Sequence, residues 1–229
     1  MSEDAIRPAL IKGLLITAGC LSESHSRAAK SCLLSYIESK VNSKSVDQDF
    51  LLILDAALEL IRKSSKFESR WVSLMRALAF LLLEIPISIQ IPCSWVIPFC
   101  ERVQHDFKTS KSPSRLAVNA KALVGVAAYH VSAWRDFALY LTHEFPSVRK
   151  QAAESFYLWG ISVMSPAESP FELYGGDLNN ALAFVSTSLS LIEGEITLEA
   201  LLKIRTEFLT YCPACINPDT QVPCCCQYS

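Results

Sequence analysis

The sequence has little glycine, no strong charge of either sign and no long apolar run. Only 7 of its 229 residues are glycine, which disfavours glycine-rich phosphate loops and turn-dense all-β folds. Its 21 Lys and Arg nearly balance 23 Asp and Glu, so it lacks the basic excess of a nucleic-acid binder. The longest run without charge, residues 85–100, contains prolines and is shorter than the roughly 18–20 residues of a spanning helix. Since no secretory signal pattern opens the chain, we expect a soluble intracellular protein.

Apolar residues recur at three- and four-residue steps along most of the chain. Within residues 49–63, Phe50, Leu54, Leu58 and Ile61 follow this spacing, which predicts an amphipathic helix. Residues 71–85 are apolar almost all round, as in a helix buried on several sides. No alternation typical of strands, bounded by hairpin dipeptides, is found in the sequence. We therefore predict an all-α fold, with further helices near residues 4–19, 25–40, 93–108, 114–130, 132–143, 146–163, 178–192 and 197–211.

An arginine followed by small and then large apolar residues recurs at Arg27, Arg70, Arg115 and Arg149. The spacings of 43, 45 and 34 residues lie near the roughly 40–47 residues of HEAT and armadillo repeats. In the inner helix of such a repeat, a first-turn arginine can pair with an acid of a neighbouring repeat. The alternative is a chance alignment of Ser-Arg pairs in a serine-rich chain. We favour a HEAT/armadillo-like helical-repeat solenoid over residues 1–211.

Motifs for catalysis and nucleotide binding are absent from the sequence. It has neither a G-x-x-x-x-G-K-[ST] loop nor a G-x-G-x-x-G loop, and its 4 histidines show no metal-ligand spacing among themselves. We therefore expect a protein that is not an enzyme, with no catalytic residue, no metal and no cofactor.

Most of the cysteines lie in a short segment at the end, residues 212–229. Four of the 9 cysteines in the chain are scattered through apolar stretches, where a reduced cysteine behaves as a small core residue. The other five are Cys212, Cys215, Cys224, Cys225 and Cys226. They could bind zinc, although adjacent cysteines are awkward ligands, or the last four residues could form a prenylation box, although its middle residues are not aliphatic. We predict a disordered tail and keep zinc binding and lipidation as alternatives.

The segment THEFPSVRKQAAESFYLW, residues 142–159, offers the best candidate for partner binding. Pro146 can open a helix there without the loss of a hydrogen bond. One face would be apolar: Val148, Ala152, Phe156 and Trp159. Three charged residues would lie largely on another face: Arg149, Lys150 and Glu154. We take Arg149 and Lys150 as candidate contacts for an acidic protein partner. For Arg149 alone we favour a structural role, an ion pair with an acid of an adjacent repeat.

Four segments together resemble the C-terminal region of the tubulin-specific chaperone D family, also called tubulin-folding cofactor D. They are KGLLITAGCLSESHSRAAKSCLLSYI, RWVSLMRALAFLLLE, WVIPFCERVQHDF and HEFPSVRKQAAESFYLW. The order and spacing of these segments also agree with the family. The resemblance covers residues 10–165 and fails over the cysteine-rich tail.

The resemblance implies a HEAT/armadillo-like chaperone that captures β-tubulin after its release from the chaperonin. It implies that the protein assembles and disassembles the tubulin heterodimer together with cofactors C and E and an Arf-like small GTPase. It also implies stimulation of GTP hydrolysis only within that complex, and a cytoplasmic, cytoskeleton-associated location. The alternative is a general helical-repeat adaptor with no specificity for tubulin.

Overall fold

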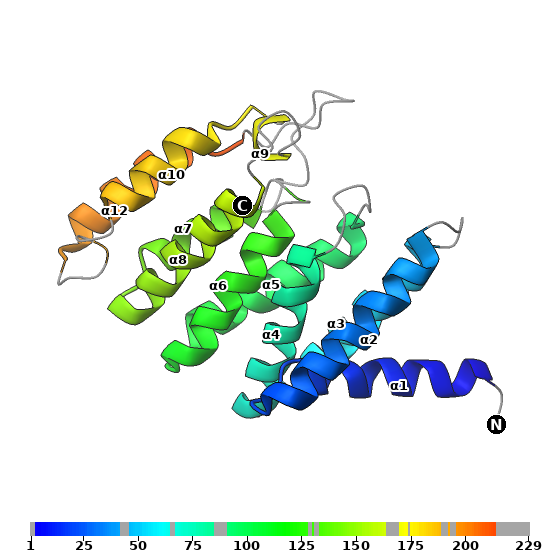
Figure 1. The fold of residues 1–229 in the computed structure, drawn as a ribbon. Helices are drawn as coiled ribbons and strands as arrows, with labels where there is room; N and C mark the ends of the chain where they lie inside the picture. The colour runs from blue at the N-terminus through cyan, green and yellow to red at the C-terminus, as the bar shows by residue number, and fades with distance from the viewer. Residues whose placement is uncertain are drawn as a thin grey trace. The chain divides into compact units, whose positions relative to one another are not determined.

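The fold is helical in every part of the chain that the structure describes. The computed structural model describes residues 3–41, 46–64, 67–84, 91–127, 130, 133–163, 170–173, 175–188, 192 and 196–213. All regular secondary structure in these ranges is helix (Figure 1). The all-α prediction is confirmed, and the helix succession is consistent with a helical-repeat solenoid.

The helices agree with the periodicity of the sequence. Their bounds are α1 Glu3–Ala18, α2 Glu23–Val41, α3 Val46–Ser64, α4 Glu68–Glu84, α5 Cys93–Thr109, α6 Pro113–Ala127, α7 Ala133–Leu141, α8 Pro146–Ser162, α9 Pro170–Leu173, α10 Leu178–Thr187 and α12 Leu198–Tyr211. The helix predicted over residues 178–192 ends earlier, at Thr187, where Ser188 caps it by donating its N–H to the carbonyl of Phe184. The one-turn helix α9 was not predicted, because four residues are too few to show a period.

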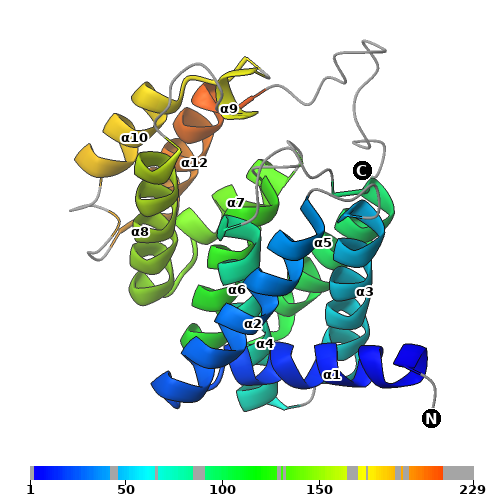
Figure 2. The same ribbon diagram turned by 45° about the vertical axis from the view of Figure 1, so that its right-hand side comes forward.

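The chain divides into two compact units, residues 1–101 and residues 102–229. In the first unit, α1, α2, α3 and α4 all pack on one another. Figures 1 and 2 show that α1 runs across the other three helices and not along them. Residues 93–101 of α5 belong to this unit, where the Trp95 indole donates from Nε1 to the Leu54 carbonyl at 2.7 Å.

A close approach between α1 and α4 depends on a glycine. Gly19, the residue after α1, is buried, and a Cβ at this position would overlap the backbone carbonyl of Ser73 in α4. The buried Ser26 fixes the following turn, since its hydroxyl donates to the Ala18 carbonyl at 2.5 Å. Only a residue without a side chain therefore fits between the end of α1 and the backbone of α4.

In the second unit, α8 and α7 each contact several other helices. The helix α8 packs against both α6 and α10, while α7 packs against α12 and also contacts α6 and α8. The Tyr140 hydroxyl of α7 donates to the Val103 carbonyl of α5 at 3.3 Å. The contacts of α6 with α8, of α8 with α10 and of α10 with α12 skip one helix in the numbering, and such contacts are typical of stacked helix pairs.

Aromatic side chains fill the core of the second unit. The Trp134 ring of α7 lies 5.0 Å from Trp159 of α8 and 5.1 Å from Phe171 of α9, between ring centroids. Phe156 lies 5.2 Å from Phe208 of α12. These contacts explain α9, because its single turn carries Phe171 into the core.

The expected cysteine-rich tail is described only as far as residue 213. Of its five cysteines only Cys212 lies within the described residues, so the disordered tail, its zinc and lipid alternatives and the domain boundary at residue 211 stay predictions. In the described part of the chain, no group of three or more His, Cys, Asp or Glu could hold a metal ion. No described helix has the length and hydropathy to span a membrane.

The substitution Gly19→Ala tests the approach of α1 to α4. We expect it to lower the free energy of unfolding by about 1–3 kcal/mol, because the new methyl group meets backbone that cannot rotate away. Gly13→Ala is the matched control, since Gly13 lies inside α1 with open space around its Cβ position. That change is expected to raise the free energy of unfolding by roughly 0.5–1 kcal/mol. Urea unfolding followed by circular dichroism measures both, and equal effects would contradict the close approach.

Candidate functional site

The helix α8 carries both residues proposed as partner contacts. It begins at Pro146, preceded by Phe145 in an extended conformation with φ −78° and ψ 118°, so the missing N–H of proline leaves no helical bond unmade. Its predicted apolar face is confirmed, because Val148, Ala152, Phe156 and Trp159 are all buried. This face holds α8 against the rest of the second unit.

Arg149 lies inside the protein, with only 2% of its surface exposed. Its Nε donates to the Ile192 carbonyl at 2.7 Å, and its Nη1 donates to the carbonyls of His143 and Glu144 at 2.8 and 3.0 Å. Burial lowers the pKa of the guanidinium because desolvation disfavours its charged form. Arg149 thus ties the loop before α8 to the segment between α10 and α12.

The prediction that Arg149 shares an outer face with Lys150 is wrong. Position 149 falls on the same side of the helix as Ala153, Phe156 and Gly160, which are all buried. The structural role that we favoured agrees with this burial, although the hydrogen bonds described above run to main-chain carbonyls and not to the expected acid. Lys150 is exposed, so the partner-binding hypothesis is retained for Lys150 alone.

The four arginines of the repeat pattern do not share one role. Arg115 of α6 is buried with Asp106 of α5, which it contacts at 2.8 Å through Nε and at 2.5 Å through Nη2. Asn119 donates to the same carboxylate at 2.7 Å. By contrast, Arg27 is exposed and pairs with Glu23 of its own helix. Arg70 is also exposed and lies over the Phe67 ring. Arg115 thus pairs with an acid of another helix, whereas the acid that Arg27 contacts belongs to its own helix and not, as predicted, to a neighbouring repeat.

His143 lies beside the hydrogen bonds of Arg149. It is buried, its Nδ1 accepts from the Phe145 N–H at 3.1 Å, and its ring packs edge-on against Phe107 at 5.1 Å. Burial is the main cause that lowers the His143 pKa. The Arg149 charge lowers it further, and Glu144 opposes the shift. The folded protein therefore favours a neutral imidazole at this position.

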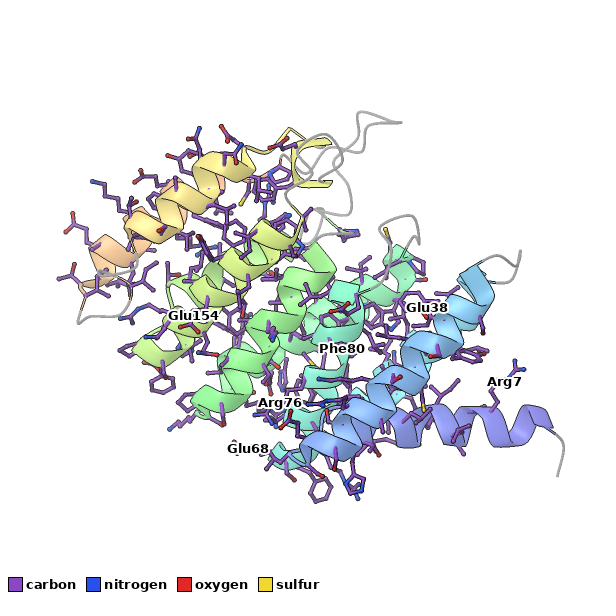
Figure 3. All side chains as sticks on the ribbon, viewed as in Figure 1. Arg7, Glu38, Glu68, Arg76, Phe80 and Glu154 are labelled. Carbon is purple, nitrogen blue, oxygen red and sulfur yellow. The ribbon has the colours of Figure 1, made fainter. Side chains whose placement is uncertain are left out.

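The opposite side of α8 is exposed along its whole length. We define the outer face of α8 by five residues: Lys150, Glu154, Tyr157, Leu158 and Ile161. Figure 3 labels Glu154, which lies midway along it. Tyr157, Leu158 and Ile161 are 45%, 59% and 45% exposed, so this face presents three apolar side chains beside its charged ones.

Tyr157, Leu158 and Ile161 were not predicted as functional residues from the sequence. They lie within the run SFYLWGI, residues 155–161, which contains both buried and exposed apolar residues. Because apolar residues occupy both sides of the helix there, the sequence does not show which side faces solvent. Helical spacing could have revealed them. Positions 154, 157, 158 and 161 follow Lys150 at successive steps of three or four residues, so they lie on the same side of the helix as Lys150.

Substitution of the two neighbouring cations separates their roles. We expect Arg149→Ala to lower the free energy of unfolding by about 2–4 kcal/mol, because buried carbonyls lose their charged donor. Lys150→Ala is the matched control and is expected to change it by less than about 0.5 kcal/mol, since Lys150 is exposed. Thermal and urea unfolding of both variants measure this difference. A parent-like Arg149→Ala variant would contradict the structural role.

The buried histidines predict a loss of stability in mild acid. Burial lowers the pKa of both His130 and His143 below the ordinary 6.5. The two imidazoles therefore bind protons more readily in the unfolded chain than in the folded protein. Their contribution is fully present above pH 6.5 and is lost as the pH falls below it. We expect His143→Asn, which retains a side-chain acceptor, to reduce the slope of unfolding free energy against pH between 7 and 5. His105→Asn, at an exposed position, is the control, and an unchanged slope in His143→Asn would refute the assignment.

Comparison with known proteins places this chain in a family. The family model that describes the C-terminal part of tubulin folding cofactor D matches residues 1–115. The comparisons with curated proteins and with solved structures returned no match. The matched range contains α1 to α5, whereas α8 lies outside it. The match implies a role in tubulin folding and partners related to tubulin. Since it spans half of the 229 residues, this chain belongs to the tubulin folding cofactor D family of chaperone-type proteins.

Proposed function

We propose that this chain binds β-tubulin as a tubulin-folding cofactor, after tubulin has left the chaperonin. The family match over residues 1–115 carries the proposal. The helical architecture supports it, because stacked helices offer an extended surface for binding another protein. The protein acts by binding, in the cytoplasm and in association with the cytoskeleton.

The cofactor function includes assembly and disassembly of the tubulin heterodimer. In this proposal the chain works with cofactors C and E and an Arf-like small GTPase. GTP hydrolysis belongs to the partners and is stimulated only within the complex. The chain itself contributes surfaces that position the partners.

The outer face of α8 is the proposed contact for tubulin. Lys150 offers a positive charge to an acidic protein, and this attraction extends over about a Debye length, 8–10 Å. The exposed Tyr157, Leu158 and Ile161 offer an apolar centre whose burial stabilises a complex. Because apolar contacts at the centre of an interface contribute most of the binding energy, the apolar residues should matter more than Lys150.

Retention of purified tubulin on the immobilised chain tests the proposal. We expect Leu158→Ser to weaken retention by about 5- to 30-fold, which corresponds to roughly 1–2 kcal/mol. Leu202→Ser is the matched control, because Leu202 on α12 is similarly exposed, at 51% against 59% for Leu158. Lys150→Glu should weaken binding less, and its effect should fade at high salt.

The outcomes distinguish the proposal that the chain binds tubulin from the proposal that the outer face of α8 is the contact. If the unaltered chain retains no tubulin, the tubulin-specific function is wrong and a general helical-repeat adaptor takes its place. If the unaltered chain retains tubulin and the Leu158 and Leu202 variants behave alike, the function stands and the outer face of α8 is not the contact.

A further inference from the structure

We propose that α2 and α4 of the first unit together form a docking surface for an acidic peptide segment of a partner protein. We define the α2/α4 patch by four residues: Lys30 of α2, and Arg76, Phe80 and Leu83 of α4. This inference goes beyond the tubulin proposal, because it concerns a different surface and does not depend on the identity of the partner.

The patch brings one cation onto an aromatic ring and places a second cation on the same side of α4. Lys30 Nζ lies 4.7 Å from the centroid of the Phe80 ring, close enough for a cation–π contact. Arg76 precedes Phe80 by one turn of α4 and Leu83 follows it by three residues, so all three share a side of the helix. Figure 3 shows Arg76 and Phe80 following one another along α4. Arg76 and Leu83 are exposed, while Lys30 and Phe80 are half-buried.

The two positive charges have no carboxylate partner among the residues that the structure describes. Three other cations of the first unit do have one, whereas none is described for Arg62 or Arg70. Lys12 and Lys63 both contact Glu59, at 2.5 and 2.6 Å, and Arg27 contacts Glu23 at 2.6 Å. The pairing lowers the pKa of Glu59 to about 2 through its hydrogen bonds to Lys12 and Lys63. What distinguishes Lys30 and Arg76 is their position, because Lys30 lies over the Phe80 ring and Arg76 lies on the same side of α4 as that ring. A carboxylate from another protein can satisfy these two charges.

The surroundings of the patch define the ligand further. Phe80 and Leu83 offer apolar surface next to the cations, so an apolar side chain beside the carboxylates fits the patch. Glu84, exposed at the end of α4, repels carboxylates there. The acidic part of the ligand should therefore lie at Lys30 and Arg76, with its apolar side chain over Phe80 and Leu83. Two cations in a chain of net charge −2 are too few for a nucleic-acid backbone.

The test is the binding of a fluorescein-labelled peptide to the full chain, followed by fluorescence anisotropy. The probe is a 12-residue peptide of Asp and Glu with one central Leu. We expect Arg76→Glu and Lys30→Glu each to weaken binding by about tenfold, equivalent to about 1.4 kcal/mol. Phe80→Leu should weaken it by a smaller factor without a change in salt dependence, because it removes no charge. Binding by the unaltered chain should weaken between 50 and 300 mM salt.

Arg62→Glu is the matched control. Arg62 is also exposed and also lacks a described carboxylate partner, but it lies on α3 and has no described contact with the ring of Phe80. We expect this variant to bind the peptide within twofold of the unaltered chain. Thermal unfolding verifies that each variant is folded, and Arg76→Gln replaces Arg76→Glu if the latter is not.

Three results would overturn the proposal. The first is an absence of peptide binding by the unaltered chain at 1 mM. The second is an equal loss of binding in the Arg62 and Arg76 variants, which would mean that only the total charge matters. The third is equally tight binding of a 12-nucleotide DNA strand, which would mean a site for any polyanion. The peptide assay contains no tubulin, so its failure would not contradict the proposal that the chain binds tubulin. A failure to retain tubulin would likewise not contradict the proposed peptide site.

Discussion

The hydrogen bonds of one buried guanidinium hold together the end of the second unit. The carbonyls of His143 and Glu144 lie in the loop before α8 and outside any helix, so helical hydrogen bonds do not satisfy them. Arg149 reaches His143, Glu144 and Ile192 at once. A guanidinium suits this task because its donors point in fixed, divergent directions in one plane, whereas an ammonium offers a single point of charge. The connection between the loop before α8 and Ile192, which follows α10, therefore depends on an arginine at this position.

The burial of Arg149 also determines what α8 can offer to a partner. Successive residues of an α-helix are separated by about 100° around its axis, so Lys150 points away from the core when Arg149 points into it. The same helix can then serve two purposes. Its inner side carries Arg149 and the aromatic core, and its outer face carries Lys150 and three exposed apolar residues.

Periodicity predicted the helices well because the burial of apolar side chains drives their formation. It predicted α3 from the spacing of Phe50, Leu54, Leu58 and Ile61, all of which are buried. It could not predict the burial of Arg149, since charged residues are almost never fully buried unless paired, and the carbonyls that pair with this one are up to 43 residues away. It also could not reveal that Gly19 meets α4, because a close approach of two backbones leaves no pattern in the local sequence.

The two proposed surfaces are both small, and their size has a consequence for binding. The α2/α4 patch offers two cations and one ring, and the outer face of α8 offers three exposed apolar side chains. An exposed ion pair contributes at most about 1 kcal/mol, and a few apolar contacts contribute only a few kcal/mol before the cost of association is subtracted. Either surface alone therefore supports weak, rapidly reversible binding. Added salt is expected to weaken a contact with the cations of the α2/α4 patch and to leave a contact with the apolar residues of the outer face of α8 intact, because salt screens charges and does not weaken apolar burial.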